Sequence, residues 1–224
     1  SRTYPYTYLN PNPLQQFADW YDLLTEKDRQ IFSQGASIGF LDAIKLINMR
    51  CNEQGKTLII RDWTHLDYTP SPFYETPTNR LTFAETLQDM FELINFSTVR
   101  HPIDQYLSLS KLQVMQNHLA VNPYMDGCYQ FARAAGETGF IRYEDFTRDP
   151  DTLLKTICDA LQIEFDPNYR DRWHTYTNIT GDVTGTRAQA EIKPLKRRDF
   201  EPQLLQQFMN NPNYMACCDL LGYE

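Results

Sequence analysis

Three short apolar runs, separated by stretches with helical periodicity, constrain the fold of this chain most strongly. The runs cover residues 57–60, 93–99 and 139–143. Short apolar runs are typical of buried strands, and strands that alternate with helices are typical of a parallel sheet. We therefore expect an α/β fold with a parallel sheet flanked by helices. The length of 224 residues fits one domain, and we interpret residues 1–224 in that way.

Helices are expected where apolar residues recur at helical spacing behind a capping residue. The expected helices cover residues 13–24, 26–32, about 37–52 and 150–162, and two more begin near Pro202 and Pro212. Asp149 is the expected N-cap of the 150–162 helix, with Pro150 at its first position. The 37–52 helix has an apolar stripe that we interpret as core packing, formed by Ile38, Leu41, Ile44, Leu46 and Ile47.

The charge balance limits the kinds of partner that the chain binds. Acidic residues outnumber basic ones, and the formal net charge is −8. This balance provides no general electrostatic attraction to a nucleic acid duplex or to an anionic membrane. We expect no nucleic acid partner, and any anion site must be a local basic pocket.

The cysteines and the hydropathy indicate a reducing compartment. The cysteines are odd in number and none follows Cys-x-x-Cys spacing, which favours free thiols over a disulfide framework. No window offers the roughly 18 apolar residues that a membrane helix needs, and residues 1–13 lack the apolar segment of a signal peptide. We therefore expect no membrane span and a cytoplasmic location. Histidines and cysteines are not grouped at metal-ligand spacing, so no metal site is indicated.

Arg100 follows the second apolar run, at the expected carboxyl end of a strand. Ligands of open parallel sheets bind at this edge, and a helix beginning at Pro102 would direct free backbone N–H groups toward an anion there. Ser108 lies about two helical turns further on, where its hydroxyl could share the anion. In the alternative, Arg100 pairs with Asp104 and Ser108 is an ordinary helical serine. We interpret His101 as a cap of this helix.

Residues 99–110, VRHPIDQYLSLS, resemble the 3′-phosphate-binding motif of PAPS-dependent sulfotransferases. The resemblance implies that Arg100 and Ser108 hold the 3′-phosphate of the adenosine cofactor. Residues 140–167 resemble the next segment of that family, a strand ending in Tyr-Glu-Asp and then a helix after Asp-Pro. By this likeness Tyr143 reaches the adenine or ribose side of the cofactor. Without it, Tyr143 would be an aromatic residue that closes the core at a strand end.

Residues 62–67, DWTHLD, are similar to the Lys-Thr-His-Leu-Pro segment of cytosolic sulfotransferases. The similarity implies that His65 is the catalytic base, and an imidazole can remove the proton of an acceptor hydroxyl near neutral pH. Trp63 stands where the family has lysine. Arg61 is a candidate for the missing positive charge or for a scaffold ion pair, and Asp62 is a candidate to orient His65 or to pair with Arg61.

Two further segments bear on the nucleotide. The GKT triplet at residues 55–57 is not a Walker A motif, because Arg50 occupies the first glycine position and the triplet precedes a strand. The basic segment at residues 184–198 matches a loop that folds over the 3′-phosphate in sulfotransferases. We expect Arg187 to make that contact, and the alternatives are Lys193, Arg197 and Arg198.

The resemblance spans roughly residues 57–198 and implies the P-loop NTPase-like sulfotransferase fold. No segment fits the family's first strand and 5′-phosphosulfate loop, and the sequence begins with Ser1. We therefore expect that strand and loop to be missing from this chain by truncation.

The function implied by the resemblance is transfer of a sulfuryl group from PAPS to a hydroxyl of a small-molecule acceptor, with PAP as the other product. Lipid, polyketide, sugar and phenol acceptors all remain open, as does the oligomeric state. One alternative is a catalytically inactive sulfotransferase-like module that binds PAP. A nucleotide kinase is a second alternative, which the lack of a Walker A motif weakens.

Overall fold

The computed structural model describes residues 20–33, 38–175 and 191–224. The chain divides into two compact units, Ser1–Arg61 and Asp62–Glu224. Within the described part of the chain no helix is both long enough and apolar enough to cross a membrane. The interpretation as one domain and the truncated first strand and loop both stay predictions.

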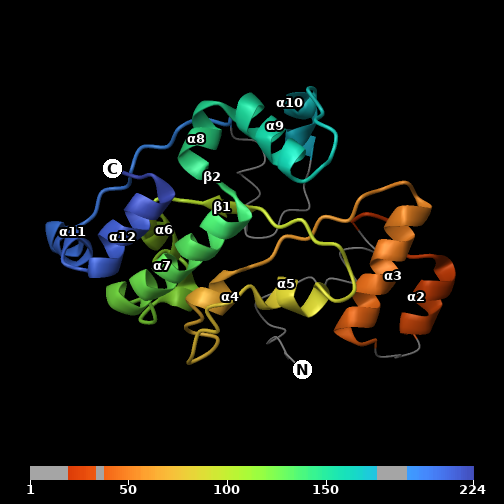
Figure 1. Cartoon of the computed structure of the whole chain (residues 1–224), viewed down its shortest axis with the longest axis horizontal. Coiled ribbons are helices and arrows are strands. Elements are labelled where there is room, and N and C mark those ends of the chain that lie inside the picture. Colours follow the sequence, from red (N-terminus) through yellow and green to blue (C-terminus); the bar gives the residue numbers. More distant parts are fainter. Residues whose placement is uncertain (1–19, 34–37, 176–190) are drawn as a thin grey trace. The chain divides into compact units, whose positions relative to one another are not determined.

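The Ser1–Arg61 unit contains two helices, α2 (Glu26–Ser33) and α3 (Phe40–Glu53), drawn in red and orange in Figure 1. They confirm the helices expected at residues 26–32 and 37–52. Residues 13–19 of the first expected helix lie outside the described residues. Residues 20–24 are not helical, and that part of the prediction is wrong, because Asp22 has a φ of +49° that no α-helix accommodates.

An ion pair and a small apolar cluster stabilise this unit. The Thr25 hydroxyl accepts from the Asp28 backbone N–H, and the Thr25 N–H donates to the Asp28 carboxylate, which fixes the start of α2. Arg50 of α3 donates two hydrogen bonds to the same carboxylate, at 2.8 and 2.9 Å, and they lower the pKa of Asp28 to about 2. The cluster consists of the buried residues Leu23, Ile47 and Cys51, and the partly buried Leu58 packs against it.

The sheet of the Asp62–Glu224 unit has two strands among the described residues, β1 (Ser97–Val99) and β2 (Phe140–Arg142). They pair in parallel, with Val99 opposite Arg142. The expected parallel pairing of the second and third apolar runs is confirmed, over shorter segments than predicted. The strand expected at residues 57–60 is wrong: this run has no regular secondary structure and lies outside the described sheet, and Ile59 is 55% exposed. An apolar run becomes a strand only where another backbone pairs with it.

Helices make up most of the Asp62–Glu224 unit. Before β2 they are α4 (His65–Tyr68), α5 (Thr82–Leu87), α6 (Pro102–Leu109), the short η1 (Gln113–Met115) and α7 (Val121–Thr138). After β2 they are α8 (Tyr143–Arg148), α9 (Pro150–Ala160), α10 (Tyr169–Arg172), η2 (Trp173–Thr175), α11 (Pro202–Met209) and α12 (Pro212–Leu221). Figure 1 shows the strands near the centre of this unit, with α7 and α12 on one side and α8 and α9 on the other.

The expected helix starts are confirmed wherever proline follows a capping residue. The α9 helix begins at Pro150, and the Asp149 carboxylate accepts a hydrogen bond from the Thr152 N–H at 3.2 Å. Helices α11 and α12 begin at Pro202 and Pro212. These starts are local features, because a side chain caps backbone groups only two or three residues away.

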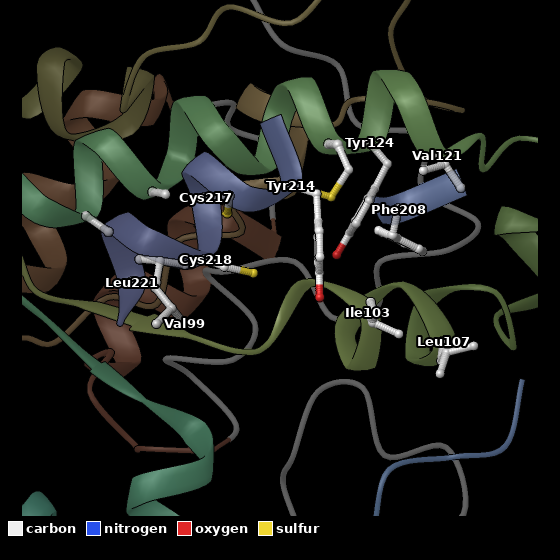
Figure 2. Packing of buried hydrophobic residues seen from close by; sticks show 13 residues of the cluster. Val99, Ile103, Leu107, Val121, Tyr124, Phe208, Tyr214, Cys217, Cys218 and Leu221 are labelled. Atoms are coloured by element: carbon white, nitrogen blue, oxygen red, sulfur yellow. The ribbon is translucent and has the colours of Figure 1, made fainter. Parts of the chain in front are cut away.

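The main core joins α6, α7, α11 and α12 beneath β1. Figure 2 shows Ile103 and Leu107 of α6 directed toward the same cluster as Tyr124 of α7 and Phe208 of α11. The buried Tyr124 hydroxyl donates to the Pro102 carbonyl at 2.8 Å, so its polar end is satisfied at the start of α6. This packing holds the segment that carries Arg100.

Candidate functional site

A cavity of about 470 Å³ opens beside the carboxyl ends of β1 and β2. Its volume lies in the range of about 300 to 1,000 Å³ that small-molecule sites occupy. Three of the predicted site residues line it, His65, Arg100 and Tyr143. They come from three separate segments: the first residue of α4, the residue after β1 and the first residue of α8. The tertiary structure therefore brings the predicted base and two predicted nucleotide contacts into one space.

Arg100 and Tyr143 are neighbours because of the strand register. Val99 pairs with Arg142, so the residues that follow them leave the sheet side by side. The Arg100 guanidinium carbon lies 5.0 Å from the centre of the Tyr143 ring, a cation–π contact. The Arg100 Nε is buried and has no hydrogen-bond partner among the described residues. A buried donor without a partner is rare in proteins, and an anion in the cavity would satisfy it.

The alternative ion pair between Arg100 and Asp104 is not formed among the described residues. Asp104 is occupied by Arg197, whose Nε lies 3.1 Å from its carboxylate. His101 caps α6, as expected, through a hydrogen bond that its Nδ1 accepts from the Ile103 N–H at 3.3 Å. The His101 backbone N–H donates to Glu144 at 3.0 Å, which connects the end of β1 to α8.

The remaining predicted nucleotide contacts lie elsewhere. Ser108 is in α6 and does not line the cavity. Arg187 lies outside the described residues. The alternatives to Arg187 have partners of their own: Lys193 is 3.8 Å from Glu191, Arg197 pairs with Asp104, and Arg198 donates to the Leu107 carbonyl at 3.1 Å. Arg197 and Arg198 thus hold the end of the basic segment against α6.

Both ring nitrogens of His65 have partners, and these partners assign its tautomer. Nε2 lies 3.3 Å from the backbone carbonyl oxygen of Ser71, which can only accept, so Nε2 carries the ring proton and donates it. Nδ1 then keeps a lone pair, which accepts the hydrogen bond donated by the Thr69 hydroxyl at 2.5 Å. The Trp63 ring stacks on the imidazole with the centroids 5.4 Å apart.

Burial keeps the His65 imidazole neutral. The side chain is only 8% exposed, and burial lowers its pKa below the usual value of 6.5. A neutral imidazole keeps a lone pair on Nδ1 that can accept a proton, and in His65 this lone pair accepts the Thr69 hydrogen bond. The position and charge state of His65 therefore suit proton removal from a group in the cavity.

The wall of the cavity includes residues that the sequence did not indicate. Thr69 follows His65 by one helical turn, and that spacing is the one signal that could have identified it. Cys128 of α7 and Cys217 of α12 have no such signal, since their helices meet only in the folded chain.

All five cysteines are free, and burial raises the pKa of the Cys128 thiol to about 12. In the described part of the chain, no three His, Cys, Asp or Glu side chains are grouped to bind a metal.

We expect acidification from pH 7.5 to 5.5 to lower the free energy of unfolding. Burial lowers the pKa of both His65 and His101, while both titrate near 6.5 in the unfolded chain. Below pH 6.5 the unfolded state therefore binds protons that the folded state does not. Urea denaturation at the two pH values measures the loss.

The His101→Asn variant is the matched control for this titration. Asparagine keeps an N-cap for α6 but does not titrate, so part of the pH dependence should disappear. Equal stability of the parent chain at pH 7.5 and 5.5 would contradict the lowered pKa values.

Comparison with known proteins identifies the fold. No family model matches the sequence, and no curated protein is significantly similar to it. Among solved structures, the sulfotransferase domain from the curacin biosynthetic pathway is similar, with a TM-score of 0.58 and 17% sequence identity. The similarity covers 97% of this chain and 81% of that domain. The chain has a sulfotransferase fold, as the motifs predicted.

Proposed function

We propose that the chain is a sulfotransferase that moves a sulfuryl group from PAPS to a hydroxyl of a small-molecule acceptor and releases PAP. The observation that carries the proposal is the arrangement of Arg100, Tyr143 and His65 around one cavity. A basic group, an aromatic ring and a neutral imidazole are the groups needed to bind a phosphorylated nucleotide and to remove a hydroxyl proton. The sulfotransferase fold supports the same reading.

The proposed nucleotide site is the part of the cavity lined by Arg100 and Tyr143. The unpartnered Nε of Arg100 is a donor for the 3′-phosphate, and Tyr143 lies beside it to contact the adenine or ribose. Ser108 and Arg187 complete the proposed phosphate contacts. PAPS supplies the sulfuryl group, and the protein orients it and stabilises the charge that develops during transfer, by analogy with phosphoryl transfer.

His65 is the proposed base of the site. Its lowered pKa keeps it unprotonated at neutral pH, and the Ser71 carbonyl would stabilise the imidazolium that forms. Trp63 packs against the ring where cytosolic sulfotransferases have a lysine, so the family's lysine contact has no counterpart at this position.

A second candidate is a module that binds PAP without transferring sulfuryl groups. The observation in its favour is that both ring nitrogens of His65 are already hydrogen bonded. Incubation with radiolabelled PAPS and a panel of nitrophenol, octanol and glucose separates the two candidates. Labelled acceptor indicates the enzyme, whereas tight PAP binding without any labelled acceptor indicates the module.

PAP is expected to raise the melting temperature of the chain more than adenosine 5′-phosphate does at equal concentration. The difference arises because Arg100 binds the 3′-phosphate, which adenosine 5′-phosphate lacks.

Arg100→Ala removes a charge-assisted contact of about 1.5 to 3 kcal/mol, so PAP should bind at least roughly tenfold more weakly by calorimetry.

Arg148→Ala provides the control for Arg100→Ala. Arg148 lies in α8, is exposed and pairs with Asp145 outside the cavity, so its loss should leave PAP affinity unchanged. Equal thermal shifts with the two nucleotides, or normal PAP binding by Arg100→Ala, would overturn the assignment of the phosphate site.

A further inference from the structure

The basic lone pair of His65 is directed at Thr69. The Ser71 carbonyl accepts a hydrogen bond from the His65 Nε2–H, so Nδ1 is the ring nitrogen that can accept a proton, and the Thr69 Oγ1 lies 2.5 Å from it. An acceptor hydroxyl that approaches the ring must therefore displace the threonine hydroxyl or pass its proton through it. Thr69 and His65 both line the cavity, so Thr69 is within reach of a bound acceptor.

The backbone and the packing around Thr69 restrict the orientation of its side chain. Thr69 is the C-cap of α4, and its N–H donates to the His65 carbonyl at 2.9 Å. Its methyl carbon Cγ2 lies against α7, only 2.5 Å from the point where a β-carbon on Gly127 would stand. With the methyl group packed against α7, the hydroxyl remains directed at the imidazole. Displacement would break this arrangement, whereas a relay preserves it.

We propose that Thr69 is a catalytic residue that relays the acceptor proton to His65, an inference that rests on the proposed sulfuryl transfer. The acceptor oxygen forms a bond to sulfur while the bond from sulfur to the departing phosphate oxygen of the nucleotide breaks. The acceptor proton moves to Thr69 Oγ1 as the threonine proton moves to Nδ1. His65 ends as an imidazolium whose Nε2–H stays hydrogen bonded to Ser71, and Thr69 is regenerated as a hydroxyl.

The hydrogen bond from Thr69 to His65 Nδ1 in the resting protein can be tested without measuring sulfuryl transfer. In a nitrogen–proton correlation spectrum of the parent chain labelled with nitrogen-15 histidine, His65 should show a protonated Nε2 and an Nδ1 that accepts a hydrogen bond. Thr69→Val removes the donor, so the Nδ1 resonance should move toward that of a free lone pair. Thr69→Ser keeps the hydroxyl and should retain the parent resonance. An Nδ1 resonance identical in all three proteins would overturn the hydrogen bond and the relay.

The relay itself is tested by single-turnover transfer from saturating PAPS to the best acceptor among nitrophenol, octanol and glucose. Thr69→Val should lose about 10²-fold in rate, the lower end of what proton-transfer groups contribute, and Thr69→Ser should recover most of that loss. Thr69→Ala is a second hydroxyl-free variant with the same expected loss. Thr156→Val removes an exposed hydroxyl of α9 that does not line the cavity, and its rate should stay near that of the parent.

PAP affinity is measured for each variant and should equal that of the parent. An unchanged affinity shows that a slower transfer does not come from a damaged nucleotide site. Parent-like transfer by Thr69→Val would show that the acceptor reaches Nδ1 directly and would overturn the relay while leaving the proposed function intact. The absence of sulfuryl transfer by the full-length protein would overturn the proposed function and the relay together. The nitrogen resonances of the same samples would still decide whether Thr69 donates to Nδ1.

Discussion

His65→Ala is expected to transfer sulfuryl groups about 10²- to 10⁴-fold more slowly than the parent chain, the usual effect of removing a general base. The substitution removes the Nδ1 lone pair that is proposed to receive the acceptor proton through Thr69. PAP affinity should stay near normal, because the imidazole is not among the proposed phosphate contacts. Single-turnover transfer and PAP calorimetry on the same preparation measure the two quantities.

The pH dependence and a second histidine complete this test. The parent rate should fall only below pH 6.5, since burial lowers the pKa of His65 beneath that value and protonation then fills its lone pair. His118→Ala serves as the control, because this histidine is exposed and does not line the cavity. If His65→Ala keeps most of its turnover and an unaltered pH profile, another group is the base.

Gly127→Ala is expected to destabilise the chain by about 3 kcal/mol or more, a severe effect for a single added methyl group. A β-carbon at this position of α7 would stand 2.1 Å from the carbonyl oxygen of Tyr68 and 2.5 Å from Cγ2 of Thr69. Since the nearest atom belongs to the backbone, α4 would have to move away from α7. Urea denaturation of the parent and the variant measures the difference.

Gly136→Ala is the matched control in the same helix. A β-carbon there meets nothing within 4 Å, so the substitution should stabilise the chain, by up to about 1 kcal/mol, through the higher helix propensity of alanine. Because α4 carries His65, the surviving folded fraction of Gly127→Ala should also lose sulfuryl transfer. A Gly127→Ala protein as stable as the parent would show that α4 and α7 are not in close contact.

The sequence by itself was sufficient for features that depend on near neighbours. The start of α9 was predictable because Asp149 caps N–H groups within three residues and Pro150 has the φ of a helix. The cap by His101 was predictable for the same reason. The parallel pairing of β1 with β2 followed from two apolar runs separated by helices, and it places Arg100 beside Tyr143. Ser108 and Arg187 stay predictions.

Only the tertiary structure decided which apolar run joined the described sheet and which groups surround His65. The run at residues 57–60 has strand character, but strand formation depends on a second backbone, which no local pattern specifies. The partners of His65 depend on the path that the chain takes after α4, which places the Ser71 carbonyl at Nε2 and leaves Nδ1 to Thr69. The contact of α4 with α7 at Gly127 joins segments some sixty residues apart in the sequence. Such contacts form because packing and hydrogen bonding act between whatever surfaces the fold brings together, irrespective of distance along the chain.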